Sequence, residues 1–503
     1  MANGGIIGKV NNPTSTTATG VWQQEEQYEA KVTDTWPQRA LFTTKSARFN
    51  SGSSDYLNRT PASAGNRRTL TFSTWFKRSS SLGANQVLFS TSEGASTING
   101  DCIRVNDANK LDIFYYDGSA MDYRYTSNQV LRDVSAWYHV CVAIDTTQGT
   151  ASNRIKVYLN GNEVTSFATE TDPSQNFDTQ FNNTQVHSVS RRGTSGSEYF
   201  NGYIAEAVLV DGQQLDPTSF GVANSDGVWT PIPYSGTFGT NGFNLQFQNS
   251  AALGTDSSPN GNTFTVNNLT SIDQSTDYPV VNFATLNSLT KASDVTLSNG
   301  NLTTLGTSNG INGTVGSTTI GIPSSGKWYY EIKYVNVIAN AYYPKSGLIS
   351  VEDTQFGRLL NDDAGTAGYT TNSIGFRQNG QKFYNNSASS FGNSVSNGNI
   401  VQWYVDMDNG AVYVGINDTV QNSGNPASGA SKTGAIWTFT AGTYSALMPS
   451  TSDYNGSSMS FNFGSPAYSI SSSNADGNGY GNFEYAVPSG FYALNTANLA
   501  EFG

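Results

Sequence analysis

The stretch "RIKVYLNGNEV", residues 154–164, decides the fold class of this chain. Ile155, Val157 and Leu159 alternate with other side chains, and alternate residues of a strand point to the same face of a sheet. The Asn-Gly pair at 160–161 follows directly, and both residue types tolerate the positive φ of a two-residue hairpin turn. The stretch therefore predicts a β-hairpin with one face buried in a core.

The same alternation recurs along the body of the chain. It is present in "LTFSTWFKR" (residues 70–78), in "KWYYEIKY" (327–334) and in "VQWYVDMDNGAVYVGI" (401–416), where a second Asn-Gly pair separates two expected strands. No long amphipathic helix pattern follows residue 45. Closely spaced strands without helices between them favour an all-β fold of antiparallel sandwiches.

The length of 503 residues is enough for more than one core. We predict an N-terminal segment with one short helix, two β-sandwich domains of the jelly-roll type, and a structured connector with short strands in "FNLQF" and "TFTV". The expected boundaries are 1–45 for the N-terminal segment, 46–215 for the first sandwich, 216–290 for the connector and 291–503 for the second sandwich.

Charge and hydropathy exclude several classes of protein. The 26 basic and 38 acidic residues give a net charge of −12, which repels the phosphates of nucleic acid. No apolar run is long enough for a signal peptide or a membrane span, so we expect neither a standard export signal nor membrane insertion. Cys102 and Cys141 lie among strand-like residues, which favours two buried thiols, although the sequence leaves their pairing open.

Two parts of the body resemble known families. Between residues 46 and 215, "LTFSTWFKR", "WYHVCVAID", "IKVYLNGNEV" and "YFNGYIAEAVLVDGQQL" follow the order and spacing of laminin-G-like, concanavalin A-like domains. That resemblance implies a jelly-roll sandwich whose open face or loops bind glycans or protein partners. Residues 320–465, with "SSGKWYYEIKY", "SIGF" and "GNIVQWYVDMDNGAVYVGIN", resemble a SPRY domain, another recognition sandwich, but "GIND" replaces its usual Lys-Asn-Gly turn.

The N-terminal segment has its own resemblance. "GGIIGKVNNPT" followed by "GVWQQEEQYEAKVTDTWP" is similar to the N-termini of virion proteins of marine tailed phages, which laminin-G-like modules usually follow. Residues 22–31 contain strong helix formers, but a helix this short is marginal unless it packs on a surface. Trp22, Tyr28 and Trp36 are the apolar groups available for docking. They would anchor the segment either on the first sandwich of its own chain or on another virion protein.

The sequence contains no assembled catalytic set. Glucan hydrolases on the concanavalin A-like fold use paired carboxylates, but the nearest match, "ETDPSQ", has Gln175 in place of the second glutamate. His139 and His187 are the only histidines, and His139 lies within a strand-like run that favours a packed side chain. We therefore expect no enzyme, no catalytic residues, no metal site and no cofactor, with calcium bound by surface loops left open.

Three tyrosines are the candidate ligand-binding residues. Tyr116, Tyr123 and Tyr125 lie in the expected hairpin "IFYYDGSAMDYRYTS", and exposed aromatic rings stack on the apolar faces of sugars. For any single tyrosine, ordinary cross-strand packing is the favoured interpretation.

Together these features predict a non-enzymatic phage virion protein, a tail fibre or adhesin on the virion surface, made in the host cytoplasm. Residues 1–45 would bind other virion proteins, and the sandwiches would bind host-surface glycan. Fibres of this kind are commonly trimers, so a homotrimer is expected. A decoration or head-fibre protein is the alternative, and a polysaccharide depolymerase is a more remote one.

Overall fold

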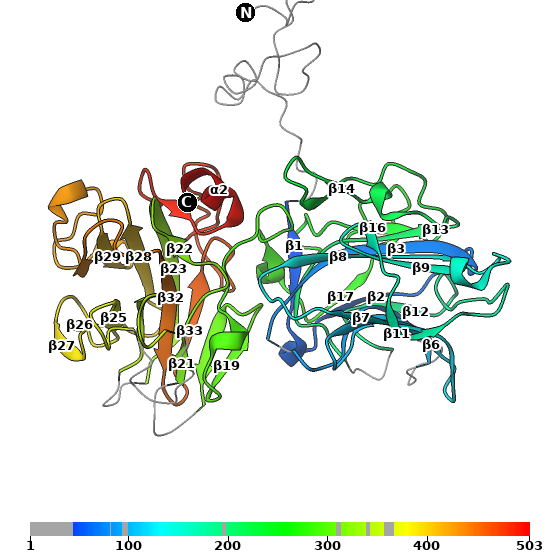
Figure 1. Ribbon diagram of the computed structural model, residues 1–503, viewed down its shortest axis with the longest axis horizontal. Helices are drawn as coiled ribbons and strands as arrows, with labels where there is room; N and C mark the ends of the chain where they lie inside the picture. The colour runs from blue at the N-terminus through cyan, green and yellow to red at the C-terminus, as the bar shows by residue number, and fades with distance from the viewer. Residues whose placement is uncertain are drawn as a thin grey trace, which may run out of the picture. The chain divides into compact units, whose positions relative to one another are not determined.

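The computed structural model describes residues 44–80, 82–92, 99–193, 198–307, 313–338, 343–356 and 367–503. All of them belong to one compact unit, Thr43–Gly503. The predicted anchor, with its helix at 22–31 and with Trp22, Tyr28 and Trp36, lies outside the described residues. The all-β fold class is confirmed, because antiparallel strands make up two sandwiches (Figure 1). The α-helix among the described residues is α2 (Thr496–Phe502), at the C-terminal end of the chain.

The first sandwich consists of two eight-stranded sheets, which we name the β3 sheet and the β5 sheet. Figure 1 shows β3, β8 and β9 in one layer and β6, β7 and β12 in the other. The β3 sheet has the order β10 (Asn162–Glu163), β9 (Ile155–Leu159), β8 (Trp137–Asp145), β3 (Thr69–Arg78), β13 (Gly202–Asp211), β1 (Ser46–Phe49) and β18 (Gln274–Ser275), with β16 (Phe243–Leu245) also paired to β13. The β5 sheet has the order β11 (Phe167–Thr171), β7 (Met121–Val130), β6 (Lys110–Tyr116), β5 (Gly100–Val105), β4 (Gln86–Ser92), β12 (Val186–Val189), β2 (Tyr56–Arg59) and β17 (Thr265–Asn267).

Alternation of apolar side chains sets the inner face of the β3 sheet. Ile155, Val157 and Leu159 of β9 lie in the same hydrophobic core as Phe72 and Phe76 of β3. The predicted hairpin is confirmed, since Asn162 pairs with Leu159 across the turn. The two turn residues at 160–161 have φ of 49° and 81°, as a turn with two positive φ angles requires.

Residues 216–290 add strands to the first sandwich. The strands β16, β17 and β18 pair with β13, β2 and β1 respectively, so the stretch completes both sheets. A separate two-stranded hairpin is formed by β14 (Gly221–Ala223) and β15 (Trp229–Pro231). The boundaries at 45, 215 and 290 stay a prediction.

The second sandwich consists of a nine-stranded sheet and a seven-stranded sheet, which we name the β23 sheet and the β24 sheet. The β23 sheet has the order β19 (Val295–Ser298), β20 (Thr303–Gly306), β33 (Ser458–Asn462), β23 (Lys327–Asn336), β28 (Ile400–Asp406), β29 (Ala411–Ile416) and β30 (Thr419–Val420), with β31 (Trp437–Thr438) on β29 and β34 (Tyr492–Ala493) on β23. The β24 sheet has the order β21 (Gly313–Val315), β32 (Ala446–Asp453), β24 (Lys345–Ser350), β25 (Ser373–Arg377), β26 (Gln381–Tyr384) and β27 (Ser387–Ser390), with β22 (Ile322–Pro323) on β32.

Both faces of β23 are buried, for two different reasons. Trp328, Tyr330 and Ile332 point into the core between the sheets, as their alternation predicts. On the opposite face, the buried carboxylate of Glu331 accepts hydrogen bonds from the backbone N–H groups of Glu484 (3.0 Å) and Tyr485 (2.8 Å). These bonds hold the C-terminal segment against the outer face of the sheet.

The two cysteines are separate buried thiols, as the sequence favoured. Cys102 lies on β5 and Cys141 on β8, and burial raises the pKa of the Cys102 thiol to about 12. Among the described residues, no helix combines the length and the apolar character needed to cross a membrane.

Candidate functional site

An aromatic cluster covers the outer face of the β3 sheet. In the pairing of β3 with β8, Trp75 lies opposite His139 and Lys77 lies opposite Trp137. These four residues face away from the core because their neighbours Phe76 and Val140 point into it. The rings of Trp75 and His139 stack with centroids 4.7 Å apart.

The β14–β15 hairpin places a third tryptophan beside this cluster. The indole N–H of Trp229 donates a hydrogen bond to Nδ1 of His139 over 3.0 Å, and Nε2 of His139 lies 2.8 Å from Oγ of Ser73. An indole N–H only donates, so Nδ1 is the acceptor and the imidazole proton lies on Nε2, facing Ser73. Burial lowers the pKa of His139 to about 3, which keeps the ring neutral and able to accept from Trp229.

Two glycines allow the Trp229 ring to lie flat against the sandwich. A Cβ atom on Gly161 would lie 2.7 Å from Cε3 of the indole, and one on Gly221 would lie 2.5 Å from Cε2. Gly161 therefore has two tasks, since its φ of 81° also closes the β9–β10 turn. The hairpin motif that predicts the fold also shapes the outer face.

The three indole rings of Trp75, Trp137 and Trp229 line a pocket of about 360 Å³, near the lower end of the range usual for small-ligand sites. Most of its exposed lining is apolar. The lining comprises three tryptophans, three other apolar residues and four residues with amide or hydroxyl groups. They are Trp75, Trp137, Trp229, Val228, Pro279, Val280, Asn224, Asn282, Thr230 and Thr496.

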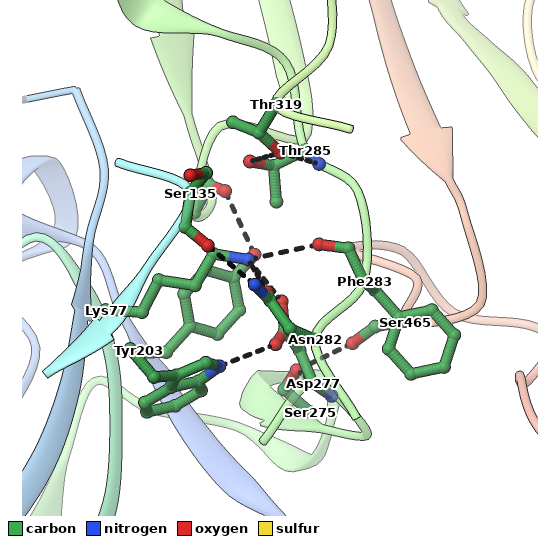
Figure 2. Close-up of polar contacts among 12 residues, drawn as sticks. Lys77, Ser135, Tyr203, Ser275, Asp277, Asn282, Phe283, Thr285, Thr319 and Ser465 are labelled. Atoms are coloured by element: carbon green, nitrogen blue, oxygen red, sulfur yellow. Dashed lines mark hydrogen bonds and ion pairs between the residues drawn. The ribbon is translucent and has the colours of Figure 1, made fainter. Parts of the chain in front are cut away.

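A buried polar network fixes one wall of the pocket (Figure 2). The ammonium group of Lys77 donates to Oδ2 of Asp277 (2.8 Å), Oδ1 of Asn282 (2.6 Å) and the carbonyl oxygen of Phe283 (3.1 Å). The other oxygen of Asp277 accepts from the indole N–H of Trp137 over 3.0 Å. Burial raises the pKa of Asp277, and the Lys77 charge partly offsets this effect.

Asn282 connects this network with the C-terminal end of the chain. Its side-chain N–H donates to the carbonyl oxygen of Ser135 (2.6 Å), and its backbone N–H donates to the hydroxyl oxygen of Thr496 (3.1 Å). The pocket is therefore composite, with walls from the first sandwich, from the segment at 279–282 and from the start of α2.

The sequence-predicted tyrosines lie elsewhere, on β6 and β7 of the β5 sheet. Tyr123 and Tyr125 are core residues, with hydroxyls that donate to Asp101 (2.6 Å) and Asp172 (2.5 Å). Both rings are buried, which agrees with the cross-strand packing that the sequence favoured, and a role of the three tyrosines in ligand binding stays a prediction. Tyr116 is half-buried, and its hydroxyl donates to the carbonyl oxygen of Gly118 over 2.8 Å.

Of the residues considered for catalysis and metal binding, His139 bonds the pocket residue Trp229, whereas Glu170 and His187 do not line the pocket. Glu170 lies on the edge strand β11, and His187 lies on β12, where burial lowers its pKa to about 4. In the parts of the chain that the structure describes, no three His, Cys, Asp or Glu side chains are grouped closely enough to hold a metal ion.

Sequence reasoning missed all three pocket tryptophans, although part of the signal was present. In "LTFSTWFKR" the core residues fix one face, so Trp75 must point to the other. A bulky aromatic on the expected solvent face is a reason to look for a ligand or a partner surface. Trp229, about 90 positions from His139, could not be placed beside it from the sequence.

One protein-family model matches the part of the chain that supplies most strands of the first sandwich. Residues 51–215 match the family model described as the concanavalin A-like lectin/glucanases superfamily. Comparison with curated proteins gives no match.

Among solved structures, the chain is similar to the SPRY domain of human HERC1 at 16% identity, covering 34% of this chain and 94% of that domain with a TM-score of 0.25. It is also similar to a human SPRY domain at 12% identity, covering 34% of this chain and 94% of the other, with a TM-score of 0.25. A putative carbohydrate binding protein from Bacteroides ovatus matches at 15% identity, with 45% of this chain and 58% of that protein covered and a TM-score of 0.32. At these scores none of the three bears on function. Residues 51–215, which match this family model, supply most strands of the first sandwich, and the tryptophan pocket lies on the outer face of its β3 sheet.

Proposed function

We propose that this protein is a non-enzymatic carbohydrate-binding protein whose ligand occupies the tryptophan pocket. The observation that carries the proposal is the joint presence of three indole rings and four amide or hydroxyl side chains in one pocket of about 360 Å³. Aromatic faces pack on the C–H surface of a pyranose, and amides and hydroxyls bond its hydroxyl groups. The match of residues 51–215 to a superfamily of lectins and glucanases supports this chemistry.

The proposed biological setting is the surface of a phage particle, where the protein acts as a tail fibre or adhesin and binds host-surface glycan. The support is the resemblance of residues 4–14 and 20–37 to the N-termini of phage virion proteins. In this proposal residues 1–45 attach the protein to the particle, and a homotrimer presents the sandwiches to the host.

Replacing Trp229 with alanine tests the pocket directly. Trp229→Ala in the full chain is expected to weaken binding of a glycan identified on an array by at least about tenfold, because buried aromatic anchors dominate binding energy. Trp229 lies on a peripheral hairpin outside the main core, so the sandwich should remain folded. Isothermal titration with the array hit measures the change.

Val222→Ala is the matched control, because Val222 lies on the same hairpin, is 39% exposed and does not line the pocket. Equal affinity of all three proteins for the glycan would reject the pocket as the binding site. Release of reducing ends from host polysaccharide by the wild-type protein would reject the non-enzymatic assignment.

Deleting residues 1–45 tests the anchor. The β body should remain folded, as judged by circular dichroism, because both cores are made of later residues. Incorporation of the truncated protein into particles, measured by immunoblotting of purified virions, should be lost. Unchanged incorporation would contradict the anchoring role.

A further inference from the structure

The absence of charge in the pocket lining points to a specific class of sugar. We propose that the tryptophan pocket selects an uncharged hexopyranose unit and rejects the corresponding uronic acid. This inference rests on the proposed glycan-binding function and specifies its substrate class.

The pocket offers no cation to an acidic sugar. None of its lining residues is a lysine, arginine or histidine. The ammonium of Lys77, in the network behind the Trp137 wall, already donates three hydrogen bonds, to Asp277, Asn282 and Phe283. A carboxylate entering the pocket would lose its hydration without gaining a charged partner, which is unfavourable.

The surroundings also disfavour an anion electrostatically. The faces of the indole rings carry partial negative charge, and the indole N–H of Trp137 points to the carboxylate of Asp277 and not into the pocket. Asp226 lies in the exposed turn between the lining residues Asn224 and Val228, so this turn supplies an acidic and no basic side chain. A neutral sugar meets none of these penalties.

An organic cation is the competing occupant, because aromatic rings attract quaternary ammonium groups. Two features favour the sugar. The Asp277 charge is paired with Lys77 at 2.8 Å, so the wall behind Trp137 carries no net charge. The side-chain amide of Asn282 is already bonded to Lys77 and Ser135. The three other polar side chains of the lining, Asn224, Thr230 and Thr496, match the hydroxyls of a sugar, whereas a quaternary ammonium has no group to bond with them.

The test compares sugars that differ only at C6. Binding of methyl glucoside and methyl galactoside to the full chain is measured by saturation-transfer NMR and by tryptophan fluorescence, beside the methyl glycosides of glucuronic and galacturonic acid. We expect at least one neutral sugar to bind and its uronate to bind at least about tenfold more weakly. Tetramethylammonium is the cation probe and should not compete.

A variant with an added positive charge tests whether the missing cation excludes the uronate. Val228 lines the pocket and is 57% exposed, so Val228→Lys should fold and place an ammonium at the rim. The variant should raise the ratio of uronate affinity to neutral-sugar affinity above the ratio measured for the wild type. Val222→Lys, on the same hairpin but outside the lining, should leave both affinities unchanged.

The outcomes distinguish failure of the selectivity for neutral sugars from failure of the proposed glycan binding. Uronate binding as tight as hexose binding, and lost in Trp229→Ala, would overturn the selectivity and leave the glycan site standing. Competition by tetramethylammonium, or binding of tetramethylammonium alone, would also overturn it. Binding of no sugar, neutral or acidic, in any test would overturn both the selectivity and the proposed function.

Discussion

Lys77→Met is expected to lower the free energy of unfolding by about 3–5 kcal/mol, the usual cost of removing one partner of a buried ion pair. The side chains of Lys77 and Asp277 are both only 1% exposed. Without the ammonium group, the carboxylate of Asp277 keeps only uncharged donors among these partners, the indole N–H of Trp137 and the backbone N–H of Phe283. Asn282 and the carbonyl oxygen of Phe283 lose their donor. Urea unfolding of the full chain, followed by tryptophan fluorescence and circular dichroism, measures the loss.

The chain contains a matched control for this experiment. Arg68 and Asp178 form an ion pair at the same 2.8 Å distance, but their side chains are 44% and 47% exposed. Solvent screens such a pair, so Arg68→Met should change the stability far less than Lys77→Met does. Similar losses in the two variants would show that burial of the Lys77–Asp277 pair does not govern its contribution.

A second replacement separates lost charge from lost packing. In Lys77→Met with Asp277→Asn, no unpaired charge remains in the interior, so part of the stability should return. The same network supports the Trp137 wall of the pocket, and the single variant should therefore also weaken sugar binding.

Much of the fold was predictable because alternation reports which side chains share a face. The repeated pattern in residues 154–164 and 327–334 predicts the core positions of β9 and β23, and the structure confirms them. Alternation does not say whether the opposite face is covered. The outer face of the β3 sheet is covered by the β14–β15 hairpin and by the segment at 279–282, which are distant in the sequence.

The candidate site was less predictable, because alternation does not show which elements cover a face of a sheet. Tyr123 and Tyr125 alternate along β7, but alternation does not say whether their shared face is exposed, and the structure places both rings in the core. The pocket depends on the register that places Trp75 opposite His139 and on the hydrogen bond from Trp229 to that histidine. Strand register and hydrogen bonds between distant residues form only in the folded chain, so they could not be predicted from this one sequence.

A buried carboxylate in the second sandwich should make stability depend on pH. Asp453, at the end of β32, is fully buried, and burial raises its pKa from 3.8 to about 7. Its Oδ2 accepts from the hydroxyl of Thr451 over 3.2 Å, whereas no described group bonds its Oδ1. The folded state therefore retains a proton that the unfolded chain releases near pH 4. This contribution to stability is fully present below pH 4 and is lost as the pH rises through about 7.

Asp453→Asn should remove that dependence, since an amide resembles the protonated carboxyl in shape and cannot ionise. Wild type and variant should be about equally stable at pH 4, and at pH 8 the variant should be more stable by up to about 4 kcal/mol. Urea unfolding at both pH values measures the difference. Asp101→Asn is the contrasting variant, because Asp101 is equally buried but accepts from Tyr123 and from two backbone N–H groups. An amide N–H there would face donors and should destabilise the protein at every pH. A stability difference between wild type and Asp453→Asn that stays constant from pH 4 to pH 8 would show that Asp453 does not titrate in this range.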